Sequence, residues 1–401
     1  MRNLRNEAID CFQSLGFPGK KDEAWKYTSL SGVLREPLTV QEQCDPPASV
    51  HGIAGLDAHT GVFVGDTRSD SLSSLASLPE GVIVSSLTSA PPALVAAHLG
   101  QHATISGRAF VALNTAFLRN GAFVYMPDGT VCEQPIHIVH ALTGAGATLA
   151  QPRTLVVAGT GAQLRLIETV EAHLSGSSLI NGVTEIFVGP DAHVSRFEIQ
   201  DPANHISVVS TLDVYQNGGS HFQNNTFTFG GNVMRNNINM LPDAEGCETL
   251  LHGLFIARGH SHIDNHTLVD HAKPRCFSSE NYRGILDGHA TGVFNGKVLV
   301  RQDAQQINAY QTNKSIVLAN TARMYAKPEL EIYADDVKCS HGATTGQLNE
   351  EALFYLRSRG LTLSQARTLM LQAFARDIIE KVPLQPLRDA LDQRVAAGLM
   401  H

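Results

Sequence analysis

A spaced repeat in the middle of the chain constrains the fold more than any other feature of the sequence. Residues 154–168 align on residues 184–198 at an offset of 30, with matching Thr, Gly, Ala and Glu residues. A weaker similarity relates the segment that begins at Ile285 to the one that begins at Ile316. Repeats of this length, built from short strands and Gly or Asn turns, are typical of a β-solenoid in which each repeat forms one coil.

Helical periodicity is absent over residues 109–346, where short β-branched runs alternate with Gly, Asn and Asp. We therefore expect a mainly β domain over this range. Its inward apolar residues should stack from coil to coil, and they include Val157, Leu164, Phe187 and Val194. A β-sandwich or jelly roll would have a similar strand content but would not predict a near-constant repeat. The open ends of a solenoid carry unpaired strand edges, which must be capped or paired with a partner.

Residues 1–108 are expected to form an N-terminal helical and α+β region. An amphipathic helix comes first and ends near Gly16. Its apolar face is formed by Leu4, Ala8, Phe12 and Leu15. Trp25 and Tyr27 follow among charged residues, and we expect these aromatic side chains to anchor the segment across the surface of the next domain.

Helical signals return in residues 347–401, which we expect to form a C-terminal helical domain. Asn349 can cap one helix and Gly360 can close it. Thr362 and Gln365 have the spacing of a capping box for the next helix. The apolar stripe predicted for that helix consists of Ala366, Leu369, Met370, Ala373 and Phe374. This stripe either packs on the β domain or docks a partner, and the sequence does not separate the two.

Composition and charge exclude several classes of protein. The 401 residues are 43% apolar and 17% charged, which is typical of a globular protein. The net charge of −8 and the lack of a Lys/Arg block argue against a nucleic-acid or membrane surface. The first residues do not form a signal peptide and no apolar stretch approaches membrane-spanning length, so we expect a cytoplasmic protein. The six cysteines are scattered, which predicts reduced thiols.

The segment 330–346 contains the candidate metal site. With the period of two of a β-strand, Val337, Cys339 and His341 share one face, so a thiol and an imidazole stand side by side. Two donors are too few to hold zinc or an iron–sulfur cluster. Either the site is open and transient, or another chain completes it. The alternative is that Cys339 is a small buried side chain and His341 a hydrogen-bonded turn residue.

Two other sets of polar residues are candidate sites. The first is a set of histidines that can ligate iron, zinc or copper, or can stack and hydrogen-bond between coils: His252, His260, His262, His266 and His271. Of these, His260 and His262 are expected on one strand face. The second is a set of carboxylates that could serve a polysaccharide-cleaving β-helix enzyme: Asp264, Asp270, Asp287 and Asp303. Their spacing does not require that use.

Several long segments resemble the SufB/SufD family of the SUF iron–sulfur cluster assembly system. They are KDEAWKYTSL at residues 21–30, DNHTLVDH at 264–271, GVFNGKVLVRQDAQ at 292–305, QTNKSIVL at 311–318 and the continuous stretch 327–360. The form CSHGATTG at residues 339–346 is closer to the SufD branch than to the SufB branch, whose members are typically longer. Residues 31–108 contribute little to the resemblance.

The resemblance implies a right-handed parallel β-helix between an N-terminal helical region and a C-terminal helical domain. It implies a non-catalytic scaffold subunit that pairs with a SufB-like subunit through the β-helix and holds a SufC-like ATPase through the C-terminal helices. Such a cytosolic complex acquires iron and builds a nascent cluster. His341 would be the principal ligand and Cys339 a secondary ligand of that iron or cluster, at the SufB interface.

The resemblance also limits the cofactors and leaves alternatives. The isolated chain is expected to bind no cofactor stably, iron or a cluster is held transiently in the complex, and a flavin in the complex stays open. The isolated chain can form a homodimer. The alternatives are a SufB-like or homodimeric β-helix scaffold and, from another class, the polysaccharide-acting β-helix enzyme.

Overall fold

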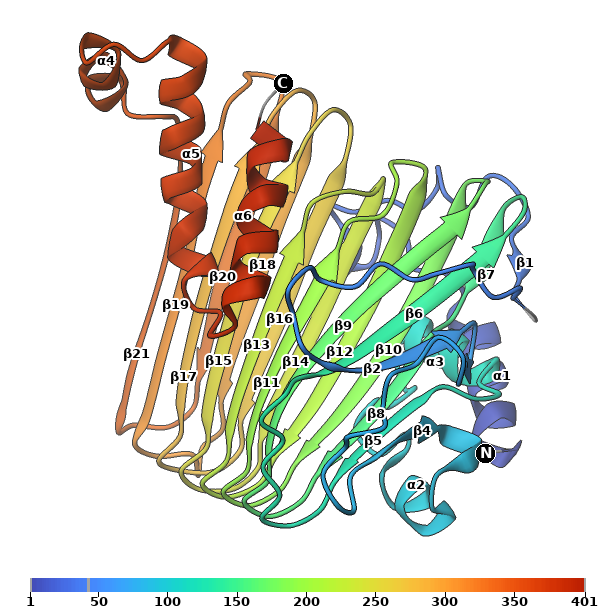
Figure 1. Cartoon of the computed structure of the whole chain (residues 1–401). Helices are drawn as coiled ribbons and strands as arrows, with labels where there is room; N and C mark the ends of the chain where they lie inside the picture. The colour runs from blue at the N-terminus through green and yellow to red at the C-terminus, as the bar shows by residue number, and fades with distance from the viewer. Residues whose placement is uncertain (1, 42–43, 400–401) are drawn as a thin grey trace.

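The computed structural model describes residues 2–41 and 44–399. Its core is a stack of about eight turns (Figure 1). Each turn contributes one strand to each of two facing parallel sheets. Hydrophobic side chains fill the space between the two sheets. The molecule is therefore mainly β, and its core is the parallel β-solenoid that the repeat predicts.

The two sheets have 11 and 10 strands. The first contains β1 (Thr39–Val40), β4 (Ile83–Ser86), β5 (Ala122–Met126), β7 (Thr148–Ala150), β8 (Arg153–Ala158), β10 (Ser178–Val188), β12 (Ile206–Gln216), β14 (Val233–Pro242), β16 (His262–His271), β18 (Thr291–Val300) and β20 (Arg323–Ile332). The second contains β2 (His59–Val64), β3 (Thr67–Arg68), β6 (Ile136–Gly144), β9 (Gln163–Leu174), β11 (His193–Gln200), β13 (His221–Thr228), β15 (Glu248–Ala257), β17 (Phe277–Leu286), β19 (Ile307–Val317) and β21 (Val337–Gly346). Both sheets continue into the N-terminal region, because β4 pairs with β5 and β2 pairs with β6.

The pairing register confirms the repeat. Neighbouring turns join residues 26 to 32 positions apart. Thr184 pairs with Thr154 at the predicted offset of 30. Ile285 likewise pairs with Ile316. The turn after β19 is one residue longer than the turn after β17. The next strand pair, β18 with β20, therefore has an offset of 32.

The faces of the strands differ from the prediction at two of the four positions. Leu164 and Val194 lie in the core between the sheets, as predicted. Val157 and Phe187 instead point outward and join an apolar cluster with helix α2 (Pro92–His98). The prediction is wrong by one residue there because both faces of these strands are covered. Apolar residues therefore follow one another without the alternation that would show the phase.

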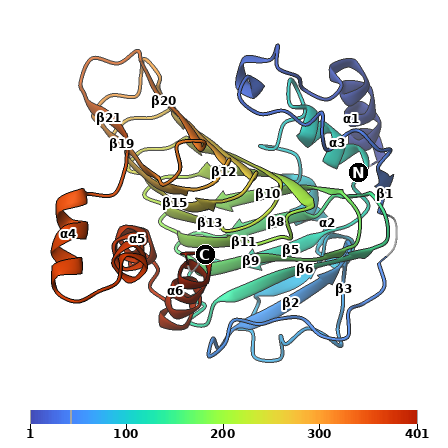
Figure 2. The ribbon, with the colours of Figure 1, turned by 90° about the horizontal axis from the view of Figure 1, so that it is seen from above.

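The N-terminal region covers the outer face of the first sheet (Figure 2). Its other helical segments are α1 (Arg2–Leu15), η1 (Glu23–Trp25) and η2 (Leu87–Ser89). Helix α3 (Ala109–Ala116) packs on α1, although it lies within residues 109–346, where the sequence pattern predicts no helix. Trp25 packs on Phe110 with ring centroids 5.2 Å apart, and Tyr27 stacks on Tyr325 of β20 at 4.5 Å. These contacts confirm that the two aromatic side chains anchor the segment across the solenoid.

Three helices follow β21, and two of them pack on the outer face of the second sheet while the first projects (Figures 1 and 2). They are α4 (Glu350–Ser358), α5 (Leu363–Ile379) and α6 (Gln385–Leu399). Their caps agree with the prediction. Asn349 accepts a hydrogen bond from the Ala352 amide at 2.9 Å, and Thr362 and Gln365 form a capping box. Gly360 has a φ of +97°, which favours glycine at a helix end.

Helix α5 buries a different face from the predicted one. Ala366 is buried and Phe374 packs against the solenoid, as predicted, but Leu369 and Ala373 are exposed. The side chains that pack on the sheet are Leu371, Ala375, Ile378 and Ile379. The prediction failed because the helix carries apolar residues on two faces, one toward the solenoid and one toward solvent. No helix within the described residues is long and apolar enough to cross a membrane.

Candidate metal centre at the open end of the solenoid

Strand β21 places Cys339 and His341 at the C-terminal end of the stack. β20 pairs with β18 and β21 with β19, and the other edge of each strand pairs with no further strand of the described chain. Cys339 pairs with Ala309, and His341 pairs with the buried Gln311. In-register neighbours of a parallel sheet point to the same side. Both candidate ligands therefore stand on the inner face, over the open interior.

The two candidate ligands differ in environment. Cys339 packs against the inner apolar cluster, and burial raises the pKa of its thiol. His341 is exposed. Within the described residues, no three His, Cys, Asp or Glu side chains lie close enough together to hold a metal ion. The chain thus offers a thiol and an imidazole, and a metal with the usual four protein ligands would need donors from outside.

Large apolar side chains are exposed on the last strands near this open end. Tyr310 of β19 and Ile332 of β20 are exposed, and Tyr333 is 64% exposed. An exposed apolar rim beside two unpaired strand edges is typical of a protein–protein contact.

Two buried polar residues beneath His341 were missed by the sequence analysis. Glu280 pairs with Gln311, and Gln311 pairs with His341, so the three residues form one column across β17, β19 and β21. Both Glu280 and Gln311 are buried. The repeat could have found them, because offsets of 30 and then 31 residues lead back from His341 to this pair.

The histidines singled out in the sequence do not converge on one site. Four of them contact a neighbour: His262 Nε2 lies 2.8 Å from Thr28 Oγ1, His266 Nε2 3.1 Å from Asp264 Oδ1, His271 Nε2 2.9 Å from Ser278 Oγ, and the His260 ring stacks on His289. His252 is buried, and burial lowers its pKa to about 4. His260 lies in the turn before β16, so it does not share a strand face with His262, and that prediction is wrong.

The four aspartates considered for hydrolysis have separate structural contacts. Asp264 pairs with Arg235 at 2.6 Å, Asp270 pairs with Arg301 at 2.8 Å, Asp287 accepts from the Gly288 amide at 2.8 Å, and Asp303 lies in the turn after β18. Asp264 and Asp270 are thus each neutralised by a different arginine, Arg235 and Arg301.

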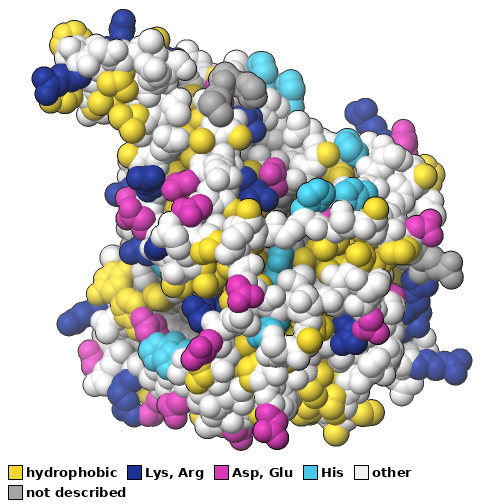
Figure 3. Space-filling model, viewed as in Figure 1, with side chains coloured by type: hydrophobic (Ala, Val, Ile, Leu, Met, Phe, Trp, Pro, Cys, Tyr) yellow, Lys and Arg dark blue, Asp and Glu magenta, His cyan; other side chains and the backbone are white. Residues whose placement is uncertain are grey.

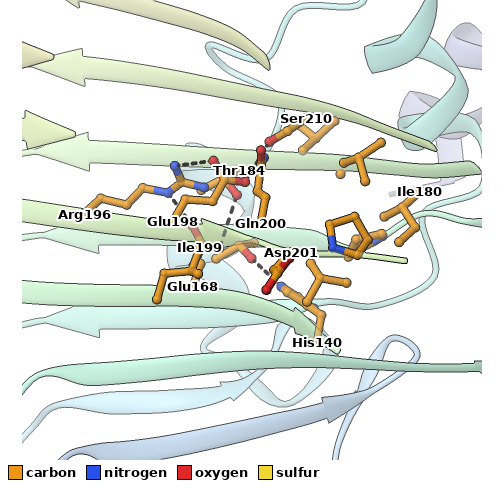
Figure 4. A pocket seen from close by; sticks show the side chains of 17 residues that line it. His140, Glu168, Ile180, Thr184, Arg196, Glu198, Ile199, Gln200, Asp201 and Ser210 are labelled. Carbon is orange, nitrogen blue, oxygen red and sulfur yellow. Dashed lines mark hydrogen bonds and ion pairs between the residues drawn. The ribbon is translucent and has the colours of Figure 1, made fainter. Parts of the chain in front are cut away.

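A cavity of about 50 Å³ lies between the sheets in the middle of the solenoid (Figure 4). Glu168 accepts hydrogen bonds from Arg196 Nε and, at 3.3 Å, from Thr184 Oγ1. Glu198 accepts from Arg196 Nη1 at 3.1 Å and from Ser210 Oγ at 3.0 Å. The guanidinium is therefore held between two carboxylates whose other oxygens are also bonded. This network stabilises the interior, although His140 Nδ1, which also lines the cavity, is buried without a hydrogen-bond partner.

The described cysteines are all free thiols. Cys247 and Cys276 occupy consecutive turns near the same end of the stack and belong to the cluster that Cys339 contacts. The two cysteines are neighbours because the residues that directly follow them, Glu248 and Phe277, are paired in the sheet. The described chain thus carries no disulfide that would hold this end closed.

Fold and site together define a class of protein: a parallel β-solenoid with helices on its flanks and an open end that carries a thiol and an imidazole on its inner face. Two family models match, described as "SUF system FeS cluster assembly, SufBD core domain" over residues 140–374 and "SufBD protein N-terminal region" over residues 1–138. The chain belongs to the SufBD family of iron–sulfur cluster assembly proteins.

Curated relatives cover nearly the whole chain. An iron–sulfur cluster assembly SufBD family protein of Synechocystis is 33% identical over 98% of this chain and 90% of its own length. The iron–sulfur cluster assembly protein SufD of Escherichia coli is 26% identical over 96% of this chain and 90% of its own length. A chloroplastic protein of Arabidopsis thaliana, ABCI7, is 26% identical over 97% of this chain and 84% of its own length.

Proposed function

We propose that this protein is a SufD-like, non-catalytic scaffold subunit that pairs with a SufB-like subunit and holds iron or a nascent cluster at the joint. The observation that carries this proposal is that the solenoid ends in two unpaired strands of ten residues each, β20 and β21. The side chain of His341, on β21, is exposed to solvent at this end. Long unpaired edges attract another sheet, and a soluble protein keeps them for a partner.

The donor set fits iron that must be released. Neutral imidazole and thiolate both ligate iron, and imidazole holds a cluster less tightly than thiolate does. His341 is the principal donor because it is exposed, whereas Cys339 is half-buried in an apolar cluster that disfavours the thiolate. Two donors from this chain and the rest from a partner would hold iron as cargo until an acceptor takes it.

Replacing His341 with Ala tests the assignment. In a complex reconstituted with SufB-like and SufC-like subunits, we expect the variant to lose at least about tenfold in Fe(II) affinity, because a first ligand is worth no less than its supporting residues. The matched control is His260→Ala, which removes an exposed histidine that stacks on His289 in a turn. Unchanged iron binding in the His341 variant would reject the role of this residue.

We further propose that the projecting α4 and the start of α5 dock the ATPase. Phe354 is 74% exposed and Tyr355 is 59% exposed, and Leu363 and Leu369 are also exposed. Figure 3 shows hydrophobic and basic side chains together on this projection. An apolar helical surface of this kind is typical of a docking site for another protein.

A charged substitution tests the docking surface. Phe354→Asp should abolish co-purification of the SufC-like ATPase and leave the SufB-like subunit bound, because α4 projects away from β20 and β21. Phe117→Asp is the control, since Phe117 is also an exposed aromatic residue but lies in the turn after α3. ATPase retained by the Phe354 variant would contradict this part of the proposal.

A second copy of the chain is the competing occupant of the open end, because it carries the same edges. Light scattering of the chain alone and after mixing with the SufB-like subunit separates the two. We expect a one-to-one heterodimer in the mixture. A homodimer that persists in the presence of the SufB-like subunit would favour the homodimeric scaffold instead.

A further inference from the structure

The column beneath His341 contains buried polar atoms without partners. Glu280, Gln311 and His341 are in-register neighbours on three consecutive strands of the second sheet. Neighbouring strands of a sheet lie about 4.8 Å apart, so each side chain stands over the one before it. His341 forms the exposed top of this column, and Glu280 forms its buried base.

Only one polar atom of the buried part of this column, an oxygen of Glu280, has a regular hydrogen bond to the rest of the described chain. Glu280 accepts a hydrogen bond from Thr267 Oγ1 at 2.6 Å through one oxygen, while its other oxygen, Oε1, has no hydrogen bond of regular geometry and the Gln311 side chain is its polar neighbour. Both amide atoms of Gln311 are also buried without a hydrogen-bond partner. A buried polar atom left unpaired costs about 1–3 kcal/mol, so an apolar pair would stabilise the isolated fold better.

The opposite sheet leaves room for the Gln311 amide. Gly296 of β18 faces it across the interior, and a Cβ atom at that position would overlap Gln311 Nε2. The groups that face Glu280 are Thr267 of β16, Tyr282 of β17 and Gln311 of β19, and among the described residues no cation forms an ion pair with it. Burial raises the pKa of Glu280 to about 7. The column therefore ends in a carboxyl group that has a free acceptor.

We propose that Gln311 and Glu280 are positioning residues that orient the His341 ring when it binds iron. The inference rests on the proposed function of His341. A neutral imidazole binds a metal through one nitrogen and donates a hydrogen bond from the other. Gln311 Oε1 accepts this hydrogen bond, and the Gln311 amide nitrogen donates in turn to Glu280 Oε1. The ring is thereby fixed in one tautomer and one orientation.

This arrangement explains why the unpaired atoms are kept. Without a partner subunit, the His341 side chain is exposed to solvent and the Gln311 amide is buried in the interior. Once a second solenoid closes the end, the ring is confined over Gln311. The hydrogen bonds missing from the isolated chain are then formed, and they favour the iron-bound state over the empty one.

Fe(II) titration of the reconstituted complex tests the inference, with an anaerobic chelator competition to measure affinity. Gln311→Met keeps the side-chain length and removes the amide, and we expect a loss of about 10–100-fold in affinity, as for other residues that support a metal ligand. Asn313→Leu is the matched control. Asn313 lies on the same strand, is buried and has an unpaired amide nitrogen, but it stacks under Ala343. The control should stay within about threefold of the unmodified complex.

A second variant, Glu280→Gln, tests the base of the column without changing its shape. The ionised carboxylate strengthens the hydrogen bond that reaches His341. We therefore expect the ratio of the affinities of the unmodified complex and the variant to rise from about 1 at pH 6 to between about 3 and 10 at pH 8. A merely structural role would leave this ratio flat. Because Gln fills the same volume as Glu, this variant decides the question if Gln311→Met does not fold.

The outcomes are distinct. Gln311→Met within threefold of the unmodified complex, or an equal loss in the Asn313 control, would overturn the inference while His341→Ala still abolished binding. A flat affinity ratio for Glu280→Gln would overturn the role of Glu280. If His341→Ala itself bound iron normally, the proposed function would fail first and the positioning role with it.

Discussion

Two regions of the same interior handle a buried glutamate in opposite ways. In the middle of the solenoid, Glu168 is paired with Arg196 (Figure 4). Burial alone would raise the pKa of Glu168, but the positive charge of Arg196 outweighs it and holds the pKa below its ordinary value. Near the open end, Glu280 is in no ion pair with a described cation, and burial raises its pKa to about 7. The first carboxyl is ionised at neutral pH, and the second is poised between its two forms.

Unpaired buried polar atoms occur in both regions, but they are more numerous near the open end. In the middle, the oxygens of Glu168 and Glu198 all have a partner, and His140 Nδ1 beside them has none. In the last coils, inward-facing polar atoms lack one: Asn265 Nδ2, His271 Nδ1, Glu280 Oε1, Tyr282 Oη, both amide atoms of Gln311 and Asn313 Nδ2. Native interiors pair nearly all such atoms, so an unpaired group points to a function outside the isolated fold.

The comparison is tested most strongly by breaking the network in the middle. Arg196→Met leaves Glu168 and Glu198 buried without their cation, and we expect a loss of about 3–5 kcal/mol in the free energy of unfolding. Urea denaturation followed by circular dichroism measures it. Arg165→Met is the control, since Arg165 lies on the neighbouring strand, is partly exposed and bonds a backbone carbonyl. A loss below about 1 kcal/mol for Arg196→Met would show that the ion pairs in the middle of the solenoid stabilise the fold no more than the unpaired polar groups near the open end do.

The second prediction uses pH to separate the two glutamates. Because the folded pKa of Glu280 lies above the unfolded value, ionisation of Glu280 destabilises the fold as pH rises from about 4.5 to about 7. Glu280→Gln does not ionise. Its stability relative to the unmodified protein should therefore increase by about 3 kcal/mol between pH 4.5 and pH 8, at about 1.4 kcal/mol per pKa unit.

Glu168→Gln should show the opposite sign. The folded pKa of Glu168 is depressed, so its ionised form stabilises the fold above the unfolded pKa, and this contribution is lost as pH falls through the folded pKa. The variant should be less stable than the unmodified protein at pH 7, and the difference should shrink in acid. Denaturation midpoints of both variants measured from pH 4 to pH 8 test this, and parallel curves for the two would contradict the contrast.

The stack was predictable from the sequence, but the phase of some strands was not. An offset of 30 between Thr154 and Thr184 appears directly in the pairing. Val157 and Phe187 were placed inside although they face outward, because the N-terminal region covers them and leaves no polar residue to mark the outer face. The same reason explains helix α5, whose second apolar face is turned to solvent. Sequence patterns report what is apolar, not which neighbour covers it.

The candidate site was predictable only in its first layer. The period of two placed Cys339 and His341 on one face without knowledge of the neighbours. Gln311 and Glu280 are 30 and 61 residues upstream of His341, and their proximity depends on the registers of two successive strand pairs. One inserted residue in a turn changes such a register, as the offset of 32 between β18 and β20 shows. The sequence therefore predicts which residues of one strand share a face, but the structure is needed to show which residues of different strands are neighbours.

Glycines that face the interior provide a smaller test at the open end. At Gly296, an added Cβ would overlap Gln311 Nε2 and lie 2.7 Å from Phe294 Cζ. Gly296→Ala should therefore cost about 1–3 kcal/mol, as overpacking in a filled interior does. It should also weaken Fe(II) binding by the complex, because the Gln311 amide is displaced from beneath His341. Thermal unfolding and the chelator competition measure the two effects, and unchanged iron affinity would argue that Gln311 has no part in the site.

The smallest effect is expected at a glycine that lines the cavity in the middle of the solenoid. Gly182 of β10 lines the cavity, and an added Cβ would meet Pro152 Cγ at 3.6 Å, an ordinary contact. Gly182→Ala restricts the unfolded chain without strain in the folded one, so we expect a gain of about 0.5 kcal/mol in the free energy of unfolding. Iron affinity should not change. A loss of stability comparable to that of Gly296→Ala would mean that the middle of the solenoid tolerates extra volume no better than the open end. The polar network of Glu168, Arg196 and Glu198 would then depend on the cavity beside it.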